Sequence, residues 1–280
     1  YGWEKTYSWN AGADYMLFNN RISGSVDFYH KLSKGLLADV DIDPTTGWSK
    51  IFKNSATVRN VGFDLALNAR ILTATPVKWD MTLNLSYNKN CVTEMNYAPS
   101  RRGASKGNPM KGQPIGYIAV HRYGGLDENG EPTFMKKGDN TKYSYTELNS
   151  LALEDLEFVG TTNPPVFGSL SSNLTYKDFT LSFMITYKFG NKMRLPVPSS
   201  STTGLYSEWF GEEFRWVEGS DNSNKWVPKL YTAGWAPTNR DDCLLFSDKM
   251  IDKGDAIYFK SISLTYNATR LLNCIGLRGG

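Results

Sequence analysis

The sequence predicts an all-β protein, an antiparallel transmembrane β-barrel segment that forms part of a larger barrel. Two observations support this prediction. Several stretches alternate apolar and polar residues with the period of two that a β-strand requires. The connections between these stretches are alternately short and long, as are the periplasmic turns and extracellular loops of an outer-membrane barrel.

The alternation is clearest in residues 60–88. The apolar row of this hairpin is Val61, Phe63, Leu65, Leu67, Ala69, Ile71, then Trp79, Met81, Leu83, Leu85 and Tyr87. The stretch from Trp79 to Tyr87 extends roughly 27 Å and has an aromatic residue at each end, which suits an apolar band about 25 Å tall with aromatic borders. A soluble β-sandwich alternates in the same way, so this hairpin alone fits a membrane barrel and a sandwich equally well.

The same pattern gives the order of elements along the chain. The predicted hairpins cover about residues 5–29, 58–89 and 168–189, a last strand covers about 256–267, and long extracellular loops cover about 31–56, 90–165 and 190–255. Residues 18–21 and the pair Lys177-Asp178 are expected to form the tight turns of the first and third hairpins. The break at 72–76 is expected to be the turn of the second hairpin.

The lengths of the connections favour the barrel. A sandwich with Greek-key links has no reason to make every second connection short, whereas a barrel inserted from the periplasm does. The prediction gives seven strands, but bacterial single-chain barrels have an even number, and seven strands leave two open edges. The chain is therefore expected to be one piece of a larger barrel.

The composition argues against several classes of function. A net charge of +3 gives no case for nucleic-acid binding. Cys91, Cys243 and Cys274 are odd in number and far apart, so neither a disulfide framework nor a zinc site is expected. His30 and His121 are the only histidines, and no catalytic grouping of serine or cysteine with histidine can be defended. We therefore expect no enzyme activity and no cofactor.

An alternating acidic stretch does not change this expectation. Asp39, Asp41 and Asp43 would share one face of a strand, but Pro44 follows them where a calcium loop needs a glycine turn and further oxygen ligands. A solvated or lumenal row of carboxylates explains them better than a metal site does.

A series of short motifs runs through nearly the whole chain in a fixed order. These are Trp3-Glu4-Lys5-Thr6 with Asn10 and Gly12, residues 17–29, Val61-Gly62-Phe63-Asp64-Leu65, Trp79-Asp80, residues 85–90, Gly112-Gln113-Pro114-Ile115-Gly116, residues 125–130, Phe189-Gly190 and residues 261–266. In this order they resemble the C-terminal barrel strands of SusC/RagA-type TonB-dependent transporters of Bacteroidetes. Asp64 departs from the family pattern, which usually has glutamate there.

The resemblance implies a barrel of about 22 strands with a plugged lumen, in the outer membrane of a Gram-negative bacterium. It implies import of oligosaccharides or peptides, driven through TonB, with a SusD-like surface lipoprotein over the extracellular mouth. The plug domain and the TonB-contacting segment are expected to be absent from this chain, as are the final strands. Outer-membrane lipid is the expected surrounding of the barrel wall.

Two sets of residues are candidates for contact with ligand or lumen. The loop aromatics could stack on sugar rings or pack against a peptide, although holding the long loop in place is the more ordinary role for each. They are Tyr206, Trp209, Phe210, Trp216, Trp226, Tyr231 and Trp235. The second set is expected to face the lumen as a hydrated wall that contacts water or the plug. It comprises Asp14, Asp27, Asp64, Arg70, Asp80, Asn84 and Lys188.

The alternative to transport is a soluble or surface-anchored β-sandwich adhesin or carbohydrate-binding protein. Such a protein needs a conventional core between two sheets. It therefore predicts that Leu83, Leu85, Leu181 and Phe183 are covered by protein.

Overall fold

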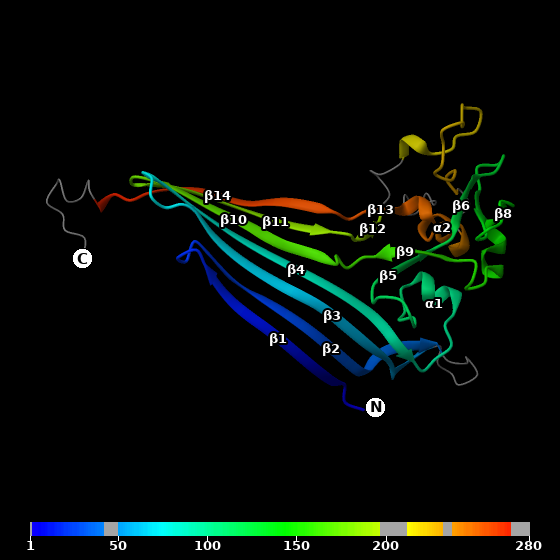
Figure 1. Cartoon of the computed structure of the whole chain (residues 1–280). Helices are drawn as coiled ribbons and strands as arrows, with labels where there is room; N and C mark the ends of the chain where they lie inside the picture. The colour runs from blue at the N-terminus through cyan, green and yellow to red at the C-terminus, as the bar shows by residue number, and fades with distance from the viewer. Residues whose placement is uncertain (1, 42–49, 197–211, 232–236, 270–280) are drawn as a thin grey trace.

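The computed structural model describes residues 2–41, 50–196, 212–231 and 237–269. Its main feature is one seven-stranded antiparallel sheet with the order β1-β2-β3-β4-β10-β11-β14. The bounds are β1 Lys5–Leu17, β2 Ile22–Asp41, β3 Lys50–Leu72, β4 Val77–Met95, β10 Val166–Tyr176, β11 Phe179–Phe189 and β14 Ala256–Tyr266. Figure 1 shows these strands as one long, curved wall, with the short turns at one end and the smaller elements at the other.

The seven predicted strands and their short turns are confirmed. Phe18, Asn19 and Asn20 all have positive φ between β1 and β2, and Lys177 has a φ of 55° between β10 and β11. The second turn lies between Leu72 and Val77, where the alternation is interrupted.

The predicted boundaries of the long loops were wrong in two places. β2 continues to Asp41 and β3 begins at Lys50, so most of the predicted loop 31–56 is paired strand, and β4 continues to Met95. The polarity pattern weakens there because these residues lie beyond the apolar band, while backbone pairing between the strands continues regardless of side-chain polarity. Asp39 and Asp41 belong to β2, and Asp43 lies outside the described residues.

The register places every apolar row on the same face of the sheet. Residues directly opposite in adjacent antiparallel strands share a face. Leu67 is opposite Leu83, Leu83 is opposite Leu170, and Leu170 is opposite Ile185. We call this face the outer face and the opposite one the inner face.

Aromatic residues border the outer face at both ends. Towards the loops, the ring centroid of Phe63 lies 6.0 Å from that of Phe28 and 5.8 Å from that of Tyr87. Towards the turns, Tyr176, Phe179 and Tyr266 are paired across three strands, and the Phe179 and Tyr266 centroids are 4.8 Å apart. Between them lies a mostly aliphatic band, in which Phe183 stacks on Phe259 with centroids 6.5 Å apart. This is the arrangement expected of a lipid-facing surface.

The β-sandwich alternative predicted a core covered by a second sheet, and this prediction was wrong. Leu83, Leu85, Leu181 and Phe183 are all partly exposed, and none is buried. Ile262 and Leu264 on β14 are 64% and 69% exposed, so no second sheet of the described chain covers this face. An exposed apolar surface of this extent is typical of a face that contacts a membrane or another protein.

Two tyrosines on the outer face cover glycines of the neighbouring strand. Tyr187 is opposite Gly168, and its hydroxyl passes over that glycine and donates to the carbonyl oxygen of Asn84 at 2.9 Å. Tyr15 repeats the arrangement over Gly24, donating to Ala66 O at 3.2 Å. The missing side chain of each glycine allows the ring to lie flat on the backbone of the adjacent strands.

Gly168→Ala should destabilise the full-length barrel by about 1–3 kcal/mol, the usual cost of overpacking. A Cβ at this position would lie 2.0 Å from Asn84 O and 2.6 Å from the Tyr187 hydroxyl oxygen, so both strand and ring must shift. The change would be measured as a lower unfolding temperature in detergent micelles. Tyr187→Phe is the control, because it removes only one hydrogen bond, worth about 0.5–1.5 kcal/mol. An alanine variant as stable as the parent would contradict this account.

The long connections fold into a compact body at the end of the sheet opposite the turns. We call it the loop cap, residues 96–165 together with the described parts of 190–255. Its elements are α1 Arg101–Ser105, β5 Tyr117–Val120, β6 Arg122–Leu126, β7 Pro132–Met135, β8 Tyr143–Ser144, η2 Tyr145–Ser150, β9 Glu157–Thr161, β12 Lys192–Arg194, η3 Glu212–Phe214, α2 Thr238–Leu245, η4 Asp248–Met250 and β13 Ile251–Lys253. None of the described helices is long and apolar enough to cross a membrane.

Most of the chain's buried apolar side chains lie in the loop cap. One cluster joins Phe134, Leu148 and Leu151 to Cys243, and so connects the second long connection to the third. Another contains Tyr117, Met110 and Leu156. The cap is therefore a packed unit, whereas the sheet has few fully buried side chains of its own.

Candidate functional site

The inner face of the sheet carries a polar hollow of about 550 Å³. Asp27 is directly opposite Asp64, and both carboxylates line the hollow. The other lining residues are Asn10, Tyr29, Lys31, Asn60, Ser86, Asn88 and Phe167, together with Phe28, whose ring lies on the outer face against Phe63. With carboxylates, amides, an ammonium group and aromatic rings, this surface can offer hydrogen bonds and stacking to a polar molecule or to a plug.

The register places all seven residues predicted to face the lumen on the inner face. Asp14 is opposite Ser25, Arg70 is opposite Asp80, and Lys188 is opposite Phe167. Asn84 donates from Nδ2 to Ser169 Oγ at 3.1 Å. Only Asp27 and Asp64 of the set line the hollow, so the others are distributed over the height of the wall.

Several residues of the hollow were missed by the sequence reasoning. Tyr29 and Phe167 are aromatic and were not considered as inner-face residues, although the alternation places both of them there. The amides of Asn10, Asn60 and Asn88 carry no charge and gave no signal beyond their position in the polar row. Cross-strand register, rather than residue type, brings these groups together.

Three of the seven predicted loop aromatics are described, and each packs within the loop cap. Trp216 lies against Gly130, where a Cβ would be 2.4 Å from its ring. Trp226 stacks on Phe214 with centroids 5.6 Å apart, and Tyr231 lies under the Arg240 guanidinium. Tyr206, Trp209, Phe210 and Trp235 lie outside the described residues. Contact of any of the seven with ligand remains a prediction.

A buried ion pair holds two parts of the loop cap together. Arg240, on α2, is fully buried and its Nε donates to Glu131 Oε2 at 2.5 Å. Its Nη2 also donates to Lys229 O at 2.6 Å. Lys229 Nζ lies 3.5 Å from the other Glu131 oxygen and 5.9 Å from the centre of the Trp216 ring. Glu131 therefore fixes α2, the 127–131 turn and Trp216 relative to one another.

His121 is a buried histidine at the centre of the cap. Its Nε2 is 2.8 Å from Cys243 O, and since a carbonyl only accepts, Nε2 carries the proton. The Nδ1 atom is buried and has no hydrogen-bond partner among the described residues. Burial lowers the pKa of His121 to about 4, so the imidazole is neutral at pH 7.

Acidification should loosen the loop cap. The folded-state pKa of about 4 lies below the 6.5 of a free histidine, so the stability contributed by neutral His121 is complete above about pH 6.5 and is lost as the pH falls towards 4. Hydrogen exchange of β5 and α2 in the full-length protein, corrected for the intrinsic rate, should accelerate over this interval. His121→Gln keeps a donor for Cys243 O and should remove that acceleration. Equal protection at pH 7 and pH 4.5 in the parent would exclude this effect.

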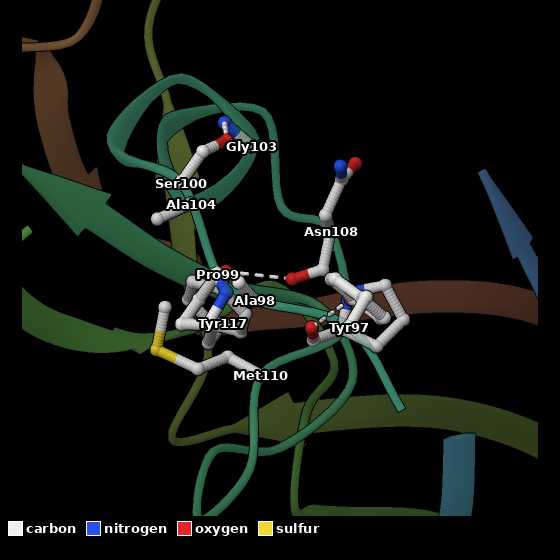
Figure 2. Close-up of a pocket in the computed structure, with 10 residues that line it drawn as sticks. Tyr97, Ala98, Pro99, Ser100, Gly103, Ala104, Asn108, Met110 and Tyr117 are labelled. Carbon is white, nitrogen blue, oxygen red and sulfur yellow. Dashed lines mark hydrogen bonds between the residues drawn. The ribbon is translucent and has the colours of Figure 1, made fainter. Parts of the chain in front are cut away.

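Two smaller cavities lie in the loop cap and beside it. The cavity in Figure 2 has a volume of about 10 Å³, enough for one water molecule at most, and is enclosed by Tyr97, Ser100 and Tyr117 among others. Tyr117 donates to Asn108 O at 2.7 Å, and Ser100 caps α1 by accepting from the Gly103 N–H at 3.0 Å. A groove of about 280 Å³ lies where β4 meets the loop cap, between Tyr87, Lys89 and Pro165.

The thiols and acidic groups suggest no further chemistry. Cys91 and Cys243 are free thiols, and burial raises the pKa of Cys243 to about 12, which leaves it protonated. Cys274 lies outside the described residues. The described part of the chain contains no group of three or more His, Cys, Asp or Glu side chains that could hold a metal ion.

Similarity to known proteins identifies the family of this chain. The family model described as TonB dependent receptor-like, beta-barrel, matches residues 1–205. The chain belongs to this family. It is therefore part of a TonB-dependent receptor barrel of the outer membrane, a family of transporters and not of enzymes, and the predicted fold class is confirmed.

Curated relatives of this chain are other TonB-dependent receptors. It is 29% identical to the TonB-dependent receptor SusC of Bacteroides thetaiotaomicron over 231 residues, covering 73% of this chain and 22% of that protein. It is 26% identical to the TonB-dependent receptor P39 of Formosa agariphila, covering 68% of this chain and 22% of the relative. The chain thus spans about a fifth of the length of these relatives.

Solved structures agree on the fold. The RagAB peptide importer in its closed-closed state matches with a TM-score of 0.70 and 23% identity, over 97% of this chain and 30% of that one. The structure of the RagAB peptide transporter matches with a TM-score of 0.69 over 94% of this chain. This wall of a TonB-dependent receptor is therefore folded like the corresponding part of that barrel.

Proposed function

We propose that the full-length protein imports oligosaccharides or peptides across the outer membrane, with energy supplied through TonB and a SusD-like lipoprotein over the extracellular mouth. The observation that supports this most directly is the family membership of a wall with an apolar outer face and a hydrophilic inner face. The relatives in solved structures are named a peptide transporter and a peptide importer, and the curated relatives include the receptor SusC.

The structure of the loop cap is consistent with a lipoprotein partner. It gathers two of the long connections into one packed body at the end opposite the short turns, which is the extracellular end of an outer-membrane barrel. A packed body offers a preorganised surface for a lipoprotein, whereas separate loops would have to be ordered on binding.

We infer that the seven polar residues on the inner face, Asp14, Asp27, Asp64, Arg70, Asp80, Asn84 and Lys188, line the lumen. Asn84→Cys and Leu83→Cys test this assignment in a background in which Cys91, Cys243 and Cys274 are replaced by serine, because the two positions are neighbours on opposite faces. A hydrophilic maleimide should label the cysteine at 84 and leave the one at 83 unmodified in intact membranes. Equal labelling of both would contradict the assignment of faces.

The transport proposal itself is tested by uptake in whole cells. Labelled oligosaccharides and labelled peptides should enter cells that express the full-length protein, and one of the two classes should be lost when its gene is deleted. Uptake should also fail when TonB is inactivated or when the neighbouring SusD-like gene is removed. Uptake of both classes unaffected by deletion of the gene would overturn the proposal. Neighbouring genes for glycoside hydrolases would indicate a glycan, and neighbouring peptidases a peptide.

A further inference from the structure

Four basic residues form a row across four successive strands on the outer face. They are Lys5 on β1, Lys34 on β2, Arg59 on β3 and Lys89 on β4. Lys5 is directly opposite Lys34. The other steps are diagonal, because the residue opposite Lys34 is Thr57, two positions from Arg59, and the residue opposite Arg59 is Cys91, two positions from Lys89. We call these four residues the basic belt.

The belt lies at one height above the short turns. Lys5 is 12 residues from Leu17, Lys34 is 12 from Ile22, Arg59 is 13 from Leu72 and Lys89 is 12 from Val77, each counted to the turn end of its own strand. Twelve residues at roughly 3.4 Å, tilted by roughly 35–45°, rise roughly 29–33 Å. An outer-membrane barrel has an apolar band about 25 Å tall, so the belt lies just beyond it on the extracellular side.

On β1–β4, the outer face carries its charged residues only at the belt and beyond it. Between the belt and the turns, the outer face of β1–β4 carries no lysine, arginine or carboxylate. Two carboxylates near the belt already accept hydrogen bonds: Glu94, opposite Thr57, accepts from Thr57 Oγ1 at 3.0 Å, and Glu4 accepts from the Leu37 N–H at 3.1 Å. All four belt residues are exposed, and none forms an ion pair within the described part of the chain.

Aromatic side chains accompany the belt. Lys34 Nζ lies 5.8 Å from the centre of the Tyr7 ring, and Tyr7 and Trp9 are 58% and 63% exposed on the same face. Tyr87 lies two residues below Lys89 in the loop-side aromatic border. Aromatic rings and cations together are characteristic of the headgroup level of a membrane.

We propose that the basic belt binds the phosphate groups of outer-leaflet lipids, which would hold a layer of phosphate-bearing lipid against this wall. The belt faces outward, so neither the plug nor a transported molecule can supply its anions. Lysine and arginine form charge-assisted hydrogen bonds with phosphate, and arginine can do so with two parallel bonds. Each cation near an anionic membrane surface contributes on the order of 1 kcal/mol, so three of them correspond to an affinity change on the order of 100-fold.

The test measures retention of lipid A, the phosphate-bearing lipid of this leaflet, by the full-length protein in nanodiscs. The variant K34Q/R59Q/K89Q removes three belt charges, and K31Q/K78Q/K188Q removes three charges from the inner face as the matched control. A third variant, K34R/R59K/K89R, keeps the charge and reports any general damage to the fold. Binding of lipid A with its phosphates, lipid A without them and uncharged phospholipid is compared for each.

The expected result is specific for both the belt and the phosphate. The belt variant should bind phosphorylated lipid A 10- to 100-fold more weakly than the parent, while the control and the charge-keeping variant should bind it as the parent does. The parent should bind lipid A that lacks phosphate about as weakly as it binds uncharged phospholipid. Equal binding by the belt variant and the parent, or an equal loss in the inner-face control, would overturn the proposal. So would equal affinity of the parent for the two forms of lipid A.

Discussion

Leu83→Arg should lower the unfolding free energy of the full-length barrel by about 2–4 kcal/mol in lipid, the cost of a basic residue at the bilayer midplane of a β-barrel. Leu83 is six residues from the turn end of β4 and is flanked on the outer face by Leu67 and Leu170. It is only partly exposed in the chain, and among the described residues no carboxylate lies beside it on this face, since Glu94 is eleven residues further along β4. The guanidinium would have to displace lipid or draw water into the apolar band.

Asn84→Arg is the matched control, because the two positions are adjacent in β4 and point to opposite faces. Asn84 contacts Ser169 on the polar inner face, where an arginine can remain hydrated, so its cost should be below about 1 kcal/mol. Both variants would be compared by thermal unfolding in lipid nanodiscs, with insertion into the outer membrane as a second measurement. Equal tolerance of arginine at the two positions would remove the basis for the outer and inner faces.

Glu131→Gln should open the loop cap at a cost of about 3–5 kcal/mol, the range found when one partner of a buried ion pair is removed. Arg240 is fully buried, and its Nε contact with Glu131 would lose the carboxylate charge that compensates it. Hydrogen exchange in α2 and in the β6–β7 turn should accelerate by roughly 100-fold or more. The sheet should keep its protection, because its strands pair with one another independently of this contact.

Lys229→Gln tests the other cation on the same carboxylate. Lys229 is 37% exposed and lies 3.5 Å from Glu131, so its ion pair is screened by solvent and should contribute less than about 1 kcal/mol. Similar effects of the two substitutions would show that the Arg240 contact is not what holds the cap. A large effect of Glu131→Gln on loop-cap exchange with an unchanged barrel melting temperature would confirm that the cap unfolds separately.

The strand pattern of this chain could be predicted because its cause is local. Whether residue 83 or residue 84 meets lipid depends on a period of two along a single strand, and the unbroken alternation of apolar and polar residues displays that period directly. The turn at 18–21 could also be predicted, since Asn19 and Asn20 tolerate the positive φ that the turn requires. The full length of β2 and β3 could not be predicted. Beyond the apolar band the two strands remain paired, but their residues no longer alternate between apolar and polar.

The sites depend on contacts between distant parts of the sequence. Arg240 meets Glu131 across 109 residues, and His121 meets Cys243 across 122, and no pattern near either residue indicates its partner. The hollow around Asp27 and Asp64 exists because the register of β2 and β3 sets these two residues opposite each other. By itself the sequence determined the barrel strands, their two faces and the family. Only the tertiary structure decided how the loops pack, which polar groups meet and which four cations share one height, because these follow from register and side-chain packing between segments far apart in the chain.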